Sequence, residues 1–338
     1  MKLQQSEINT LIFDMDGVIT SEYIYWKTAA LTVYELLYSH RYFGHQDIDR
    51  AWCRKNVSLI YDTVFCGERT IAAVKRLGVN TNWDLAYLVF CVSVYLEPAL
   101  SAFDAQHFEA VCMFIENIKI EPPALYTAVE GLAASATVVE VGYFKRTKGG
   151  LWKCLMESFQ QWFHGDAEIH GLKEEEEPVL PLAEIKKTLQ VLSDEGYTLG
   201  IGTGRPWEEI LFPLQMWGIA AYFDSAYCAS YDDVSSAEKI LKIKQPLAKP
   251  HPFVFQKAAF GHLLSDEDIY RGKIPASWPG KCLVIGDAPS DLLAAKAGGF
   301  PFAAVLTGIE GQGARPYFEE NHVDWILNSM LELIDHDN

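Results

Sequence analysis

The pattern of hydrophobic positions divides this 338-residue chain into two parts. Residues 21 to about 173 carry long segments in which apolar residues recur at helical spacing, as in 28–43, 83–97 and 149–166. After residue 181, short apolar runs typical of strands alternate with amphipathic helical segments. This alternation predicts a parallel sheet with helices on both faces, a doubly wound α/β fold.

The second part defines the boundaries of a core domain. It contains predicted helices over 183–196, 207–218, 252–264 and 291–299, and strand-type runs over 197–205, 223–230, 282–291 and 302–308. A further strand, 11–13, stands alone near the start of the chain, and the simplest arrangement places it in the same sheet. Segment 173–181, "KEEEEPVLP", is predicted to be a solvated boundary. We therefore expect a Rossmann-like core of residues 1–20 and 178–338, with a mostly helical domain, 21–177, inserted after the first strand.

The composition narrows the classes of function. Apolar residues make up 49% of the chain, which is ample for a core, and the net charge of −17 argues against binding to nucleic acid or to anionic membranes. The longest apolar stretch, 85–96, is shorter than the roughly 20 residues of a membrane span and is predicted to be a buried helix. The seven scattered cysteines, without a CxxC pair or a signal segment, indicate reduced thiols in a cytoplasmic protein.

Polar and charged residues stand where predicted strands end or helices begin. In an open parallel sheet, ligands bind beyond the carboxyl ends of the strands. The residues at these positions are Asp14 and Asp16, Thr203, Gly204 and Arg205, Lys249, and Asp287 and Asp291.

This set of side chains indicates a chemistry. Four carboxylates held close together would repel one another, and a bound cation removes that repulsion. Hard oxygen ligands with room for water and a phosphate favour Mg²⁺. A hydroxyl, a lysine and turn N–H groups suit the oxygens of a phosphate, whereas no GxxxxGK[ST] loop is present. The sequence therefore predicts Mg²⁺-assisted phosphoryl chemistry.

Four motifs together resemble the haloacid dehalogenase-like hydrolase superfamily. They are "DMDGV" (14–18), "GTGR" (202–205), "KP" (249–250) and "GDAPSD" (286–291), in the order that the family has them. The resemblance implies that the helical insertion is the family's cap, as in phosphoglycolate phosphatases and β-phosphoglucomutases. The insertion is about twice as long as that subfamily leads us to expect, so specificity residues of the cap cannot be carried over.

The resemblance also implies roles for individual residues. Asp14 would be the nucleophile that forms an aspartyl phosphate, and Asp16 the general acid and then the base. Gly17 would permit the tight turn between these carboxylates and the rest of the chain. Thr203 would bind a phosphoryl oxygen, with the turn at Gly204 beside it.

Four further positions belong to the expected site. Lys249 would neutralise the charge of the phosphate and the nucleophile. Asp287 would bind Mg²⁺ directly, beside an Asp14 oxygen and the Asp16 carbonyl. Asp291 would orient Lys249 or a metal-bound water, or cap the helix that follows. Arg205 either reaches the substrate or is a solvated or ion-paired arginine.

Several alternatives stay open at the level of sequence. The leading expectation is a Mg²⁺-dependent phosphatase of a small phosphorylated metabolite, as a monomer or homodimer. A phosphomutase would share the same motifs, and a non-catalytic binding protein is a third reading. Two basic spots of the insertion could meet an anionic substrate or could be solvated helix faces; they are Arg50, Arg54 and Lys55, and Lys145, Arg146 and Lys148. We expect the insertion to cover the carboxyl edge of the sheet and to open and close on two crossings.

Overall fold

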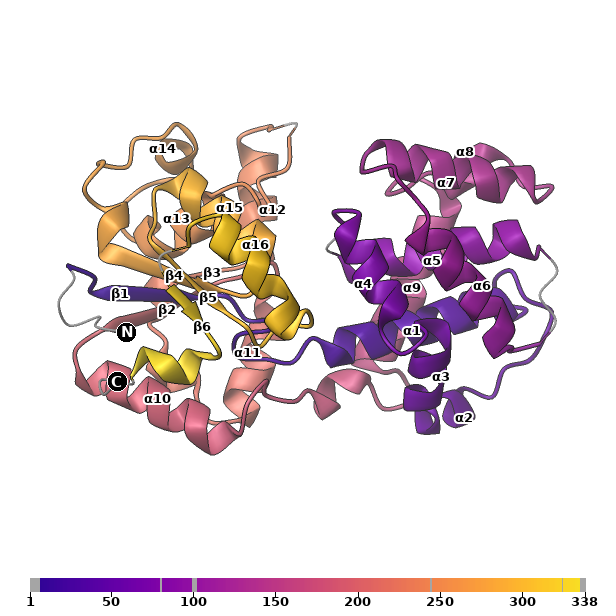
Figure 1. Cartoon of the computed structure of the whole chain (residues 1–338), viewed down its shortest axis with the longest axis horizontal. Helices are drawn as coiled ribbons and strands as arrows, with labels where there is room; N and C mark the ends of the chain where they lie inside the picture. Colours follow the sequence, from indigo (N-terminus) through magenta and orange to yellow (C-terminus); the bar gives the residue numbers. More distant parts are fainter. Residues whose placement is uncertain (1–6, 80, 99–101, 244, 324, 335–338) are drawn as a thin grey trace. The chain divides into compact units, whose positions relative to one another are not determined.

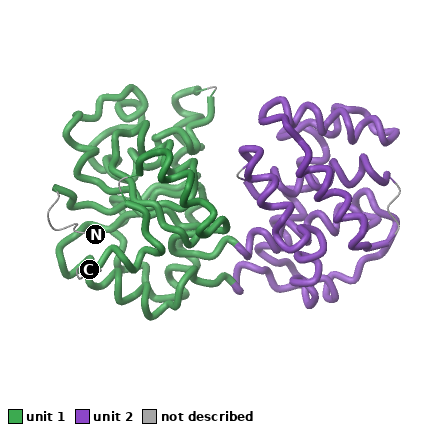
Figure 2. Tube along the Cα trace, in the orientation of Figure 1, with its two compact units in different colours: residues 1–22, 176–338 green, residues 23–175 purple. Residues whose placement is uncertain are grey.

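The chain forms two compact units. The computed structural model describes residues 7–79, 81–98, 102–243, 245–323 and 325–334. One unit comprises Met1–Glu22 with Glu176–Asn338, and the other comprises Tyr23–Glu175 (Figure 2). We call them the α/β unit and the helical unit.

The α/β unit is built on one six-stranded parallel sheet (Figure 1). Its strands are β1 (Thr10–Phe13), β2 (Thr198–Gly202), β3 (Cys228–Ala229), β4 (Cys282–Gly286), β5 (Phe302–Val305) and β6 (Trp325–Leu327). They lie in the order β3-β2-β1-β4-β5-β6. The isolated first strand therefore joins the same sheet, as predicted, and it lies at the centre, with Phe13 in register with Ile201 of β2 and Ile285 of β4.

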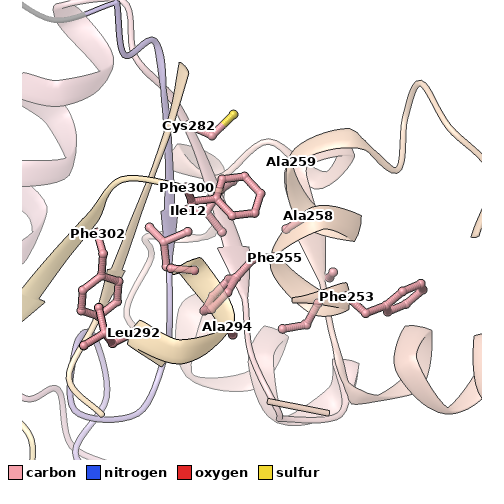
Figure 3. Close-up of a cluster of buried hydrophobic side chains, with 14 of the residues drawn as sticks. Ile12, Phe253, Phe255, Ala258, Ala259, Cys282, Leu292, Ala294, Phe300 and Phe302 are labelled. Carbon is pink, nitrogen blue, oxygen red and sulfur yellow. The ribbon is translucent and has the colours of Figure 1, made fainter. Parts of the chain in front are cut away.

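Helices cover both faces of this sheet, which confirms the doubly wound fold. The helices of the unit are α10 (Leu182–Asp194), α11 (Trp207–Met216), α12 (Tyr231–Ile240), α13 (Phe253–Phe260), α14 (Asp266–Tyr270), α15 (Pro289–Gly298) and α16 (Arg315–Glu320). Successive side chains of a strand point to opposite faces. Leu11 and Phe13 accordingly pack in a cluster with α10 and α11, whereas Ile12 packs in a second cluster with α12, α13, α15 and α16. Figure 3 shows Ile12 of this second cluster near Phe255.

The helical unit contains helices only among its regular elements in the described residues. They are α1 (Tyr23–Tyr38), α2 (Arg50–Lys55), α3 (Val57–Val64), α4 (Arg69–Arg76), α5 (Asn82–Leu96), α6 (Ala105–Glu116), α7 (Ala124–Ser135), α8 (Val141–Phe144) and α9 (Gly150–His164). The apolar stretch 85–96 lies in α5, which is buried along most of its length. Among the described residues, no helix has the length and apolar character to cross a membrane.

The structure differs from the predicted elements in several places, and helices α12, α14 and α16 of the α/β unit were not predicted. The helix predicted over 28–43 ends at Tyr38, because the chain folds back so closely that a side chain at Gly44 would overlap the Tyr38 backbone. The strand predicted over 223–230 is reduced to β3, because Asp224 caps a short 3₁₀ turn before it. Strand β6 was not predicted.

Candidate active site

The carboxyl ends of three neighbouring strands bring the first predicted residues together. Asp14 follows β1, Thr203 follows β2 and Asp287 follows β4, and these strands are adjacent in the sheet. The Asp14 N–H donates to the Ile285 carbonyl at 2.9 Å, which extends the ladder by one residue and fixes the start of the turn. Parallel pairing of the strands therefore brings together residues as far apart in the sequence as Asp14 and Asp287.

A lysine and three carboxylates form the centre of the site. Carboxylate oxygens of Asp14, Asp287 and Asp291 lie within 4.8 Å of one another. The Lys249 ammonium lies 2.9 Å from Asp14 Oδ1 and 2.8 Å from Asp291 Oδ1, and it sits over the Phe255 ring. Asp291 therefore contacts Lys249, the residue that one of its two predicted roles involves.

The electrostatics of this cluster suit a divalent cation. Burial raises the pKa of Asp14 to about 7, with further contributions from Asp291 and Asp16, while Lys249 opposes the rise. Burial by itself would lower the pKa of Lys249, but Asp14 and Asp291 raise it overall. One ammonium cannot balance three carboxylates, and carboxylate oxygens are the ligands that Mg²⁺ prefers. Asp14, Asp287 and Asp291 therefore fit a Mg²⁺ site.

Two glycines lie close to the Asp287 carboxylate. Gly17 has a φ of +72°, and a Cβ built there would lie 2.5 Å from Asp287 Oδ2. A Cβ at Gly308 would lie 1.9 Å from the same oxygen. The Thr307 hydroxyl donates to the Gly17 carbonyl at 2.6 Å and ties the two segments together. Sequence reasoning found Gly17 but missed Thr307 and Gly308, which follow β5 and carry no chemistry of their own.

The turn after β2 presents Thr203 and Gly204 differently. Thr203 is buried, and its hydroxyl accepts a hydrogen bond from the Arg205 N–H at 3.3 Å. Gly204 is exposed, with open space where a side chain would stand. Backbone N–H groups of such a turn are suited to anion oxygens.

Arg205 is buried and ion-paired within the α/β unit. Its guanidinium contacts Asp16, Thr20 and Glu176, so a phosphate would have to compete with these partners. Burial raises the pKa of Glu176 to about 7, and Arg205 opposes that rise. Glu176 belongs to the run predicted to be solvated, yet only 1% of its side chain is exposed. The prediction was wrong for this residue, because the run passes a buried arginine.

Asp291 does not occupy the N-cap position considered from the sequence. Ala288 is the N-cap of α15, and Asp291 is the third helical residue, whose Oδ2 accepts the Ala288 N–H at 3.2 Å. It therefore fixes the start of the helix from inside while its other oxygen binds Lys249. A side chain at Gly286 would lie 2.6 Å from Asp291 Oδ2, so β4 must end in glycine for this carboxylate to fit.

Three basic side chains of the helical unit are ion-paired within that unit. Arg50 pairs with Asp166 and Glu168, Arg54 with Glu175, and Arg146 with Asp84. We expected these arginines either to contact an anionic substrate or to lie on a solvated helix face. Neither expectation describes them, because each is ion-paired with a carboxylate of the same unit.

A family comparison decides the class to which this site belongs. The family described as haloacid dehalogenase-like hydrolase matches residues 8–299. The chain belongs to the haloacid dehalogenase-like hydrolases. All four motifs that suggested this family lie within the matched range, including "DMDGV" and "GDAPSD".

Individual relatives of this hydrolase are more distant. It is 29% identical to the pyrophosphatase PpaX of Bacillus pumilus over 147 residues, which are 44% of this chain and 55% of that protein. It is 25% identical to the phosphoglycolate phosphatase of Pasteurella multocida over 150 residues, 44% of this chain and 54% of that protein. The chain thus spans about half the length of these curated relatives. A crystal structure from the Northeast Structural Genomics Consortium is 28% identical and has a TM-score of 0.79, covering 96% of this hydrolase and 97% of that chain.

Proposed function

We propose that this chain is a Mg²⁺-dependent phosphatase that hydrolyses a small phosphorylated metabolite through an aspartyl phosphate on Asp14. The observation that carries the proposal is the cluster of Asp14, Asp287, Asp291 and Lys249 at the carboxyl edge of the sheet. The names of the two relatives above, a pyrophosphatase and a phosphoglycolate phosphatase, support phosphate-ester or phosphoanhydride chemistry.

In the first half of the proposed reaction, an Asp14 oxygen attacks the phosphorus atom. The bond from phosphorus to the leaving oxygen breaks, and Asp16 gives that oxygen a proton. Thr203 and the Gly204 turn would hold phosphoryl oxygens, and the Lys249 ammonium would hold negative charge beside the nucleophile. Mg²⁺ would be held by Asp14, Asp287 and the Asp16 carbonyl, with Asp291 supporting them, and would supply charge neutralisation at the phosphate.

In the second half, water attacks the phosphorus of the aspartyl phosphate. Asp16 accepts the proton of that water, the bond to the Asp14 oxygen breaks, and inorganic phosphate leaves. The enzyme returns to its starting state. The helical unit, Tyr23–Glu175, would be the cap that selects the leaving group, and the seven free cysteines support a reducing, cytoplasmic setting.

The test is a screen of phosphorylated metabolites for released phosphate, with Mg²⁺ and after EDTA treatment. We expect activity on at least one small phosphate ester, loss with EDTA and recovery with added Mg²⁺. Asp14→Asn should lower kcat by at least about 10³-fold while circular dichroism and thermal unfolding show an intact fold. Near-normal turnover by that folded variant would refute the proposed nucleophile. A phosphomutase would differ by returning the phosphate to a second hydroxyl and releasing little of it.

A further inference from the structure

Arg205 joins the turn after β1 to two other segments of the α/β unit. Its Nε lies 3.2 Å from each carboxylate oxygen of Asp16, and its Nη2 donates to Asp16 Oδ1 at 2.5 Å and to the Thr20 hydroxyl at 2.9 Å. Its Nη1 lies 2.6 Å from Glu176 Oε1 and donates to the Glu209 carbonyl at 3.2 Å. Only 3% of the Arg205 side chain is exposed. One buried guanidinium therefore holds two carboxylates by different edges.

These partners lie at the two points where the chain leaves and re-enters the α/β unit, after Glu22 and before Glu176. The two crossings are paired as a short antiparallel ladder. The Ser21 N–H donates to the Glu177 carbonyl at 2.8 Å, and the Val179 N–H donates to the Ile19 carbonyl at 3.0 Å. Arg205 adds a side-chain contact to each crossing, one through a hydroxyl and one through an ion pair.

The side chain of Asp16 is committed to this network and not to the acidic cluster. The cluster of mutually close carboxylates consists of Asp14, Asp287 and Asp291. The Asp16 carboxylate instead accepts from Arg205 and, at 3.3 Å, from the Thr20 hydroxyl. Because the guanidinium is planar, with its donors in a fixed fork, the position of Glu176 and the orientation of the Asp16 carboxylate are linked through one rigid group.

We propose that Arg205 is a positioning residue that sets the orientation of the Asp16 carboxylate and couples it to both crossings, with Glu176 as the anchor of the guanidinium. This inference rests on the proposed function, in which Asp16 protonates the leaving oxygen. It assigns Arg205 to Asp16 and not to the phosphate. A merely structural ion pair would lack any effect that depends on the leaving group.

The test compares kcat/KM for phenyl phosphate and 4-nitrophenyl phosphate. The phenolate is a strong base, with a pKa of about 10 for its acid, as in Tyr, and needs the proton from Asp16, whereas 4-nitrophenolate leaves without it. Since kcat/KM covers only the steps up to departure of the first product, hydrolysis of the aspartyl phosphate does not enter the comparison.

We expect Arg205→Met to lower kcat/KM by about 100-fold for phenyl phosphate and by less than about tenfold for 4-nitrophenyl phosphate. We call the kcat/KM for phenyl phosphate divided by that for 4-nitrophenyl phosphate the ester ratio. Arg205→Lys should not restore the ester ratio, because lysine keeps the positive charge but lacks the planar set of donors of the guanidinium. Glu176→Gln should shift the ratio in the same direction, and its effect should not add to that of Arg205→Met. Glu175→Gln, at the neighbouring exposed glutamate, is the matched control and should leave the ratio unchanged.

Several outcomes would overturn the inference. Equal losses for both esters in Arg205→Met would mean a structural or phosphate-binding role, and a normal ratio in Arg205→Lys would mean that charge alone matters. If Arg205→Met does not fold, Arg205→Lys and Glu176→Gln carry the same test. If the variants do not change the relative kcat/KM of the two esters, the role of Arg205 is refuted and the phosphatase proposal stands. A wild-type protein inactive on every ester would overturn both the role of Arg205 and the phosphatase proposal.

Discussion

Gly308→Ala should weaken Mg²⁺ binding although it replaces no charged residue. A Cβ at position 308 would stand 1.9 Å from Asp287 Oδ2 and 2.7 Å from its Cγ, where ordinary contact begins at 3.4 Å. The φ of Gly308 is not among the positive values, so alanine is compatible with the backbone. The three atoms nearest to the added Cβ all belong to Asp287, so the clash falls first on its carboxylate.

A second glycine also lies close to the Asp287 carboxylate. A Cβ at Gly17 would already lie 2.5 Å from the same carboxylate, which shows how tightly that glycine packs on it. The oxygen must move by about 1.5 Å, whereas metal–ligand distances hold to within about 0.2 Å. Changes outside the coordination shell already cost 10–100-fold in affinity, so loss of a direct ligand should cost at least about 100-fold, or about 2.8 kcal/mol.

Isothermal titration of Mg²⁺ into the metal-free protein measures this effect directly. Gly313→Ala is the matched control, because Gly313 follows in the same segment and has nothing within 4 Å of its Cβ position. We expect wild-type affinity in the control and a loss of at least about 100-fold in Gly308→Ala. Wild-type Mg²⁺ affinity in a folded Gly308→Ala protein would refute the assignment of Asp287 as a ligand.

Two further predictions follow from the charges. Burial raises the pKa of Asp14 to about 7, and Mg²⁺ requires the ionised form, so the apparent Kd for Mg²⁺ should rise by about tenfold per unit as the pH falls from 7 to 5; titrations across this range that show a constant Kd would contradict it. Arg146→Met should leave the Asp84 carboxylate, 3% exposed, without its ion pair in the helical unit. Since a third of the Arg146 side chain is exposed, we expect a loss of about 2–3 kcal/mol in urea unfolding, with Lys145→Met near wild type.

The sequence predicted those parts of the fold in which apolar residues recur with the period of a strand or a helix. Alternating strand and helix patterns predicted the doubly wound sheet, and the rule that ligands bind at carboxyl ends predicted that Asp14 and Asp287 would meet. The short strand β3 was over-predicted, because apolar residues in 223–230 look the same in a strand and in a capped 3₁₀ turn. Strand β6, three residues long, is too short to show a period.

The sequence was insufficient wherever the partner lies far along the chain. Gly308 is an ordinary glycine until β1 and β4 bring Gly17 and Asp287 against it. Glu176 is one of four consecutive glutamates, and no local pattern distinguishes the one that turns inward. Its burial follows from the position of Arg205, which only the assembled sheet defines.

The spacing of Asp14 and Asp16 takes on a different meaning once these partners are known. The resemblance assigned both carboxylates to one reaction, Asp14 as the nucleophile and Asp16 as the acid and then the base. In the structure, Asp14 belongs to the acidic cluster with Lys249, while the Asp16 carboxylate belongs to Arg205. A spacing of two residues is enough for the two carboxylates to contact different partners. The partners of Asp14 favour a bound cation, and the partner of Asp16 fixes its orientation. If Asp14 is the nucleophile and Asp16 the acid, this separation keeps the carboxylate of the acid apart from the acidic cluster.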